Sequence, residues 1–335
     1  MNTEIWQSVH QKSGEAGLTE VSPALRPSQC KVYEITEEAE WHAHFSRVPF
    51  ATFSQCWAYG EAKRAQGRNV RRLLIEANGV PIALCQVLKV QKLGVPLAAR
   101  IDRGPLFFSS QPSADEARAV FRAIRRACCF PRGGVLLIAP AIKAGDGTVP
   151  PMLGYRRRSK HGWRSALVDL RKDVGELRKQ LDQKWRNSLN KALKSPLALH
   201  LPGGTQELDW LIGRHEEHMG EKGFIAHGGG FLRALAAAAP SDIIVARAML
   251  NGEPVSGMLL VRFGLFAEYF IGWNGDNGRK HNAGNLLLWH GMLEMKQRGC
   301  AWFDLGGYET GEGFGHFKAG VRGEVYQLAG EWVTI

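Results

Sequence analysis

The sequence predicts an α/β fold of the α+β kind, with two lobes that each hold a mixed sheet flanked by helices. Its 335 residues fit roughly two domains at about 150 residues each. Period-2 and period-3.6 hydrophobic stretches are interspersed along the whole chain, as in proteins that mix strands and helices. The order of elements in the first half returns in the second. This repetition favours two lobes of similar plan, joined at the Pro- and Gly-containing segment 145–154.

Capping and turn residues define the elements of the first half. Ser54 is a good N-cap for a helix over 55–66, which Gly67 ends. The pair Asn78-Gly79 is a hairpin turn signal between strands 70–76 and 80–91. Ser113 caps a helix that runs to residue 129. The remaining expected elements are a strand at 31–36, a helix at 37–47, and strands at 98–102 and 134–139.

The second half repeats this pattern with longer helices. It opens with a strand at 166–170 and one long basic helix at 174–193. The turn Asn251-Gly252 separates strands 243–250 and 255–262. The other expected elements are strands at 197–201 and 265–273, helices at 209–222, 231–239 and 284–298, and strands at 302–305 and 325–334.

The composition indicates a globular protein, which we expect in the cytoplasm as a monomer without integral membrane contact. The chain is 44% hydrophobic and 22% charged, unlike disordered chains. It has no run of about 18 apolar residues, and its polar N-terminus lacks the apolar core of a signal peptide. The six cysteines lack metal-ligand spacing, and His215 and His218 have no evident third ligand, so we expect reduced cysteines and no metal site.

Positive charge is concentrated in one segment, 155–194. It holds thirteen Lys and Arg residues against four acidic ones, and so carries most of the chain's net charge of +11. A dense, poorly neutralised basic segment is typical of a surface that binds phosphates, although a solvated basic face without a ligand is an open alternative.

Four segments together are more specific than the fold pattern. They are Phe53-Ser54-Gln55-Cys56-Trp57 leading to Lys63, Lys184-Trp185-Arg186-Asn187 with Asn190-Lys191, Trp302-Phe303-Asp304-Leu305-Gly306-Gly307, and Gly315-His316-Phe317-Lys318-Ala319. In this order and spacing the chain resembles the Fem family (FemABX-like) of aminoacyl-tRNA-dependent peptidyltransferases, from about residue 32 to the C-terminus.

The resemblance implies two GNAT-like lobes with a cleft between them. The first would cover residues 31–154, completed by a C-terminal strand within 321–335, and the second would cover 155–320. Residues 1–30 would form an N-terminal extension outside the likeness.

The activity that the resemblance implies is that of an acyltransferase of the EC 2.3.2 kind. It would move an aminoacyl group from aminoacyl-tRNA to an amine, and so form an amide bond. The partners would be tRNA and an amine-bearing peptide or cell-wall precursor. Aminoacyl-tRNA would be a co-substrate, and no cofactor or metal would be needed.

The resemblance also implies roles for individual residues. The family's Phe-Lys motif matches Phe317 and Lys318, so Lys318 is the expected electrostatic or proton-donating group of transfer. Lys63 matches a lysine that binds the precursor's diphosphate, and Gln55 falls on the same predicted helix face. Lys222 is the nearest match to a second basic position, where an arginine is more usual, and Tyr269 is expected to line the acceptor channel. The cations expected to contact tRNA are Arg156, Arg157, Arg158, Lys184, Arg186 and Lys191.

A second reading remains open at this point. GNAT enzymes that use acyl-CoA bind its diphosphate on a glycine-containing loop at a helix N-terminus. The segment Arg279-Lys280-His281-Asn282-Ala283-Gly284 departs from that loop pattern only at Asn282. A CoA-dependent N-acyltransferase is therefore the alternative, and a non-catalytic module that binds nucleic acid or an envelope precursor is the third reading. Asp304, before Gly306 and Gly307, is expected to cap a turn.

Overall fold

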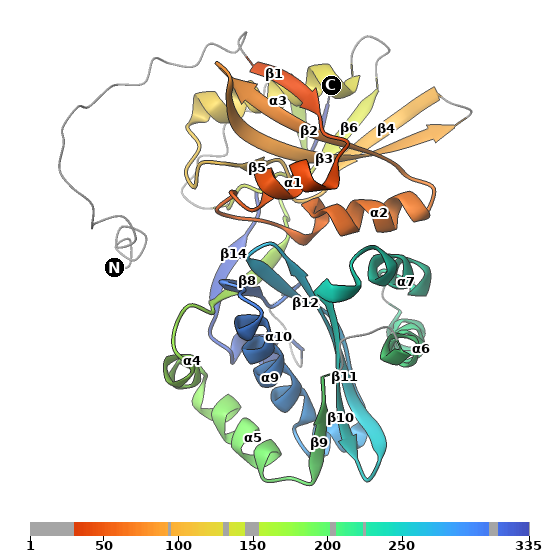
Figure 1. The fold of residues 1–335 in the computed structure, drawn as a ribbon, viewed down its shortest axis with the longest axis vertical. Coiled ribbons are helices and arrows are strands. Elements are labelled where there is room, and N and C mark those ends of the chain that lie inside the picture. Colours follow the sequence, from red (N-terminus) through yellow and green to blue (C-terminus); the bar gives the residue numbers. More distant parts are fainter. Residues whose placement is uncertain are drawn as a thin grey trace, which may run out of the picture.

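The computed structural model describes residues 30–92, 95–129, 134–144, 154–201, 206–223, 226–307 and 314–334. It confirms an α/β chain with two lobes, each built on a mixed sheet, stacked one above the other in Figure 1. The predicted extension at 1–30 and the predicted junction at 145–154 lie almost wholly outside the described residues.

The first lobe is built on a sheet of order β1-β2-β3-β4-β6-β15-β7, with β5 paired to β3. Its neighbours are antiparallel except β4 and β6, which are parallel. The strands are β1 (Cys30–Glu34), β2 (Asn69–Ala77), β3 (Val80–Lys92), β4 (Val95–Ile101), β5 (Leu106–Phe107), β6 (Val135–Ile138), β7 (Tyr155–Ser159) and β15 (Glu331–Thr334). The helices of this lobe are α1 (Glu38–Phe45), α2 (Trp57–Ala65) and α3 (Ala114–Cys129).

The second lobe is built on a sheet of order β14-β8-β13-β12-β11-β10-β9, in which β12 and β13 are parallel. The strands are β8 (Arg164–Asp169), β9 (Leu197–His200), β10 (Ile243–Leu250), β11 (Glu253–Phe263), β12 (Phe266–Asn274), β13 (Trp302–Asp304) and β14 (Glu324–Gln327). The helices are α4 (Val174–Gln180), α5 (Gln183–Leu193), α6 (Gln206–Lys222), α7 (Gly229–Ala238), α8 (Asp276–Lys280), α9 (Ala283–Gln297) and α10 (Phe314–Ala319).

The single basic helix predicted at 174–193 is wrong, because two helices occupy the segment. Leu181 and Asp182 take extended ψ values of 144° and 147° between α4 and α5. The Asp182 carboxylate accepts the Lys184 N–H at 2.9 Å and so caps a new helix. A capping box of Asp173 and Glu176 begins α4 in the same way.

The last predicted strand, 325–334, is also two elements, and they belong to different sheets. β14 pairs with β8 in the second lobe, whereas β15 lies between β6 and β7 in the first. Gly330, at φ +89°, lies between them, and a Cβ there would come within 2.2 Å of the Ser159 oxygen. Only glycine fits this crossing.

The chain passes between the lobes at two adjacent places. The division predicted after residue 154 falls before β7, which pairs in the first sheet, and the chain then crosses to β8. The returning segment lies beside this crossing, because the Leu328 N–H donates to the Trp163 oxygen at 2.8 Å. Two strands that follow the predicted division in the sequence, β7 and β15, therefore belong to the first sheet.

The lobes meet at a surface that we call the seam, and they share one hydrophobic core there. α2 of the first lobe packs against α7 of the second, as Figure 1 shows on one side of the molecule. Phe53 and Tyr59 contact the second-lobe rings Phe270 and Phe231, with ring centres 4.7 and 5.4 Å apart. Contacts of this extent hold the two lobes in one arrangement around any site between them.

Candidate active site

A cleft of about 870 Å³ lies between the lobes at the seam. Its first-lobe wall includes Tyr59, Lys63 and Arg103. Its second-lobe wall includes His227, Glu268, Phe270 and Gly307. A volume of this size accommodates a drug-sized ligand, and the ring-lined walls with a few charged groups are typical of binding sites between domains.

An ion pair joins the two lobes inside this cleft. Arg103 Nη1 donates to Glu268 Oε2 at 3.1 Å, and the two side chains are only 12% and 3% exposed. Arg103 sits in a turn at φ +47°, and its backbone oxygen accepts the Thr52 hydroxyl at 2.7 Å. Its guanidinium also lies 4.5 Å from the centre of the Trp163 ring. The pair is therefore fixed from both lobes.

Lys318 reaches the same region from α10. It is 3% exposed, and its ammonium donates to the Gly307 carbonyl at 2.8 Å and lies 4.9 Å from the centre of the Tyr269 ring. Burial lowers the pKa of Lys318 to about 8, although the nearby Asp304 and Glu268 charges favour its protonated form. The amine therefore titrates close to neutral pH, which suits a group that gives and regains a proton.

Glu268 is the acidic counterpart of Lys318. Burial raises its pKa to about 7, and this effect outweighs the opposing effects of Arg103 and Lys318. The Asp304 charge raises the pKa of Glu268 further. A buried carboxyl with a pKa of about 7 and a nearby buried amine with a pKa of about 8 are characteristic of proton-transfer sites.

Asp304 takes the turn-capping position expected for it. Its carboxylate accepts the Gly306 N–H at 2.8 Å, and the hydroxyls of Ser165 and Tyr326 donate to it. Gly306 has φ +71°, and a Cβ there would come within 2.3 Å of the Tyr269 oxygen. Because the backbone passes this close, residue 306 must be glycine, and the turn places Gly307 in front of Lys318.

Lys63 lines the cleft and lies in a cage of rings. Its ammonium is 3.5 Å from His227 Nδ1 and 4.5 Å from the centre of the Phe231 ring. Burial lowers the pKa of Lys63. Burial and the Lys63 charge lower the pKa of His227 to about 4, so the imidazole is neutral at pH 7. A lysine in this setting can exchange its aromatic neighbours for an anionic ligand.

The structure does not place Gln55 on the predicted helix face, and it does not describe the Lys222 side chain. Gln55 is not on the α2 face, because α2 begins at Trp57 and Gln55 ends a short 3₁₀ turn (Phe53–Gln55) before it. Its buried amide accepts the Gln86 N–H at 2.6 Å and donates to the Asp102 oxygen at 2.8 Å. Gln55 thus fixes the turn that carries Arg103. Lys222 is the last residue of α6, and its side chain lies outside the described residues.

The basic segment is divided between the lobes. Arg156, Arg157 and Arg158 lie on β7, whereas Lys184, Arg186 and Lys191 lie on α5. Some of them are held internally: Arg157 donates to the Ala329 oxygen at 3.2 Å, Arg158 pairs with Glu331 at 2.6 Å, and Arg186 donates to the Lys179 oxygen at 2.7 Å. Arg156, Lys184 and Lys191 are exposed.

The segment that resembles a CoA loop forms α8 and the start of α9. Arg279 pairs with Asp276 and donates to the Asn274 oxygen. Asn282 is left-handed at φ +56° before α9, and the Phe317 ring lies 3.6 Å from where a Cβ on Gly284 would stand. The ring next to Lys318 therefore packs against the first turn of this helix.

Among the cleft residues that escaped the sequence reasoning are Arg103 and Glu268. Glu268 is an acid within the apolar run 266–273, and a charge in a buried strand is a signal of function. Arg103 directly precedes Gly104-Pro105 in a turn. Neither feature indicates a partner, because the two residues are 165 positions apart in the chain.

Comparison with known proteins agrees with this architecture. Residues 176–319 match the family model described as an acetyltransferase (GNAT) domain. The structure is similar to FemX at TM-score 0.76 and 15% identity, over 91% of this chain and 97% of that one. It is also similar to a tandem GNAT protein from the clavulanic acid biosynthesis pathway (TM-score 0.53, 12% identity, 91% and 98% covered) and to L-PGS from Bacillus licheniformis (0.52, 13%, 89% and 91%). No curated protein matches the sequence.

The matched GNAT domain model covers most of the second lobe. The chain as a whole shares the fold of FemX and of the tandem GNAT protein, with two lobes around one cleft. Among the helices of the described ranges, none is both long and apolar enough to cross a membrane.

Proposed function

We propose that this protein is an aminoacyltransferase that moves an aminoacyl group from aminoacyl-tRNA to an amine, such as that of a peptide or cell-wall precursor. The observation that carries the proposal is the buried Lys318 ammonium, which donates to the carbonyl of Gly307 and lies within the electrostatic reach of Glu268, two residues that line the cleft. Similarity to FemX and to L-PGS favours an aminoacyl donor over other acyl donors.

The proposed chemistry uses two proton-transfer groups. The acceptor amine attacks the ester carbonyl carbon, a C–N bond forms, and the carbonyl oxygen becomes an oxyanion near the Lys318 ammonium. Glu268 takes a proton from the attacking nitrogen. As the ester C–O bond breaks, Lys318 gives its proton to the departing ribose oxygen. The proton on Glu268 then returns to the Lys318 amine, so both groups regain their starting state.

The remaining cleft residues would bind and orient the substrates. Lys63 can hold an anionic part of the acceptor in the cleft, while Tyr269 packs beneath the Lys318 ammonium. Phe317 positions Lys318 through its contact with the first turn of α9. The exposed cations Arg156, Lys184 and Lys191 would contact the tRNA backbone.

The proposal needs neither a metal nor a resident cofactor. One chain provides both walls of the cleft, so a monomer is sufficient. Because charged tRNA is made in the cytoplasm, the proposal also places the protein there.

The alternative is transfer from acyl-CoA, which the GNAT domain match and the segment 279–284 favour. The identity of the acyl donor, aminoacyl-tRNA or acyl-CoA, distinguishes the two proposed reactions. The purified protein would be given a pool of labelled aminoacyl-tRNA or labelled acetyl-CoA together with an amine acceptor, and label in the amide product would be counted. We expect label only from the tRNA pool. Label only from acetyl-CoA would overturn the proposal in favour of the alternative.

A further inference from the structure

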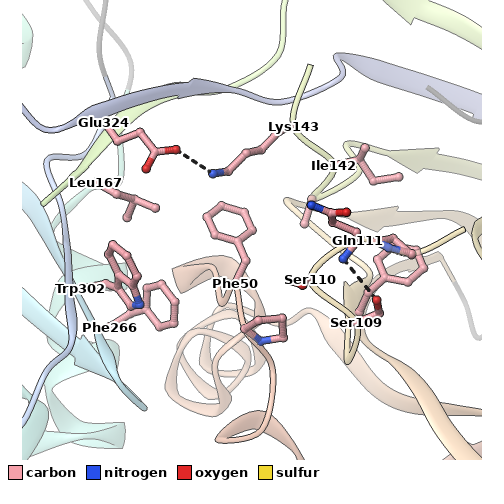
Figure 2. A pocket seen from close by; sticks show the side chains of 14 residues that line it. Phe50, Ser109, Ser110, Gln111, Ile142, Lys143, Leu167, Phe266, Trp302 and Glu324 are labelled. Atoms are coloured by element: carbon pink, nitrogen blue, oxygen red, sulfur yellow. Dashed lines mark hydrogen bonds and ion pairs between the residues drawn. The ribbon is translucent and has the colours of Figure 1, made fainter. Parts of the chain in front are cut away.

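A second cavity, of about 450 Å³, opens at the seam and shares no lining residue with the cleft. The first lobe provides Phe50, the loop 109–112 and residues 141–143, and the second provides Leu167, Phe266, Trp302 and Glu324. Figure 2 shows these side chains converging from both lobes on a common space. Cavities of this size between domains are typical ligand sites.

The inner wall of this cavity is aromatic and well supported. Phe50 lies at the centre of the cavity in Figure 2. The Phe50 ring is edge-on to the Phe266 ring, and the two ring centres are 6.4 Å apart. The Trp302 ring is held by the Arg171 guanidinium, 4.5 Å from its centre. Such walls favour a flat or bulky apolar group, because burying it removes apolar surface from water at about 25 cal/mol per Å².

The rim of the cavity carries one charge of each sign. Lys143 Nζ and Glu324 Oε1 are 3.4 Å apart, and their side chains are 39% and 54% exposed. The Lys143 ammonium lies 5.7 Å from the centre of the Phe50 ring, so it stands directly at the aromatic space. An exposed pair of this kind is worth at most about 1 kcal/mol. A ligand can therefore part the two groups at little cost and pair with each of them.

We propose that this cavity binds a free α-amino acid with a large apolar side chain. The carboxylate would pair with Lys143, the ammonium with Glu324, and the side chain would enter the space between Phe50 and Trp302. A ligand with a single charge would pair with one rim group and bring a like charge close to the other. An α-amino acid carries its carboxylate and its ammonium on one carbon atom. These two adjacent charges match the adjacent Lys143 and Glu324 groups of the rim.

A ligand in this cavity would affect the electrostatic environment of Lys318 next to the cleft. The rings of Phe50 and Tyr326 are in edge-on contact, with their centres 5.4 Å apart. The Tyr326 hydroxyl donates to Asp304, and the Asp304 charge favours the protonated form of Lys318. The ligand would also touch both lobes and so hold them together. The binding itself does not rest on the transfer reaction, so it can be tested without an activity assay.

Titration calorimetry on the full chain with L-tryptophan provides the test. Saturable 1:1 binding is expected, with affinity more than threefold weaker for tryptamine, which lacks the carboxylate, and for indole-3-propionate, which lacks the ammonium. L-alanine, which lacks the apolar group, should bind at least tenfold more weakly. Lys143→Gln and Glu324→Gln should each weaken L-tryptophan binding more than threefold. Glu217→Gln is the matched control, because the Arg214–Glu217 pair is similarly exposed and lies on α6, none of whose residues lines the cavity.

Two results would overturn the inference. One is the absence of saturable binding of L-tryptophan, L-phenylalanine and L-leucine to a protein whose melting curve shows it folded. The other is binding that tryptamine or indole-3-propionate reproduces within threefold, or that both rim variants leave unchanged. Because Lys143 and Glu324 are exposed, neither substitution is expected to alter the fold.

Discussion

Arg103 of the first lobe and Glu268 of the second lie 3.1 Å apart across the seam, with both side chains almost fully buried. Neither lobe alone completes this contact. It places a group with a pKa of about 7 beside the Lys318 ammonium and holds the cleft walls at a fixed separation. The pair thus couples the packing of the two lobes to the protonation state of Glu268.

The first prediction concerns the stability contributed by this pair. Arg103→Gln leaves Glu268 without its cation, and removing one partner of a buried ion pair costs about 3–5 kcal/mol. Glu268 has its pKa raised above the unfolded value, so its ionisation in the folded state lowers stability as pH rises through about 7. Chemical denaturation should therefore show a larger loss for Arg103→Gln at pH 8 than at pH 6. An equal loss at both pH values would refute the assignment of this pH dependence to Glu268.

The second prediction is a bell-shaped pH profile of transfer. The ascending limb should lie near pH 7, where Glu268 becomes a carboxylate, and the descending limb near pH 8, where Lys318 loses its proton. Glu268→Gln should remove the ascending limb and lower the rate by about 100-fold or more. The measurement is single-turnover transfer between pH 5.5 and 9.5. The prediction fails if the ascending limb persists in Glu268→Gln.

The third prediction separates Lys63 from Gln55. Lys63→Met should raise the KM for an anionic acceptor and leave the melting temperature equal or higher, because burial already disfavours the Lys63 charge. Gln55→Ala should lower stability by about 2 kcal/mol, since it leaves the buried Gln86 N–H without its acceptor and removes one of the two donors to the Asp102 carbonyl. Steady-state kinetics and thermal melts on both variants check this. A stable Gln55→Ala variant with an altered KM would return Gln55 to the substrate site.

The fourth prediction concerns tRNA binding. Replacing Lys184 and Lys191 with Gln should lower the slope of log affinity against log salt by about two, and Arg156→Gln should lower it by about one. Lys31→Gln, an exposed change on β1, is the control and should leave the slope unchanged. Filter binding at several salt concentrations provides the slopes. If only the control changes the slope, the basic segment is not the tRNA surface.

The sequence could predict the elements whose signals are local. The hairpin β10–β11, with Asn251 and Gly252 in its turn, and the helix α3 after Ser113 lie within two residues of their expected bounds at most ends. The break at Asp182 was missed because apolar residues continue at helical spacing across it. The division of the last strand was missed because β14 and β15 are both extended, and only their pairing partners, which are distant in sequence, separate them.

The site was predictable only where a motif marks it. Lys318 and Lys63 follow from short segments that resemble a known family. Lys63 lines the cleft, and Lys318 donates to Gly307, which lines it. Arg103 and Glu268 come together through the packing of two lobes, which no local pattern encodes. Gln55 is a residue for which the spacing was misleading. Helical spacing predicted that its side chain lies on a binding face, whereas the side chain is buried and donates to backbone oxygens.

The central claim is that Lys318 drives aminoacyl transfer within the cleft. Its most direct test is single-turnover transfer from a charged tRNA pool to an amine, comparing the native chain with Lys318→Met, which keeps the length of the side chain, and with both proteins shown to be folded by their melting curves. The account predicts a rate at least 100-fold lower for Lys318→Met, with tRNA affinity unchanged. A Lys318→Met rate within threefold of the native rate would contradict it.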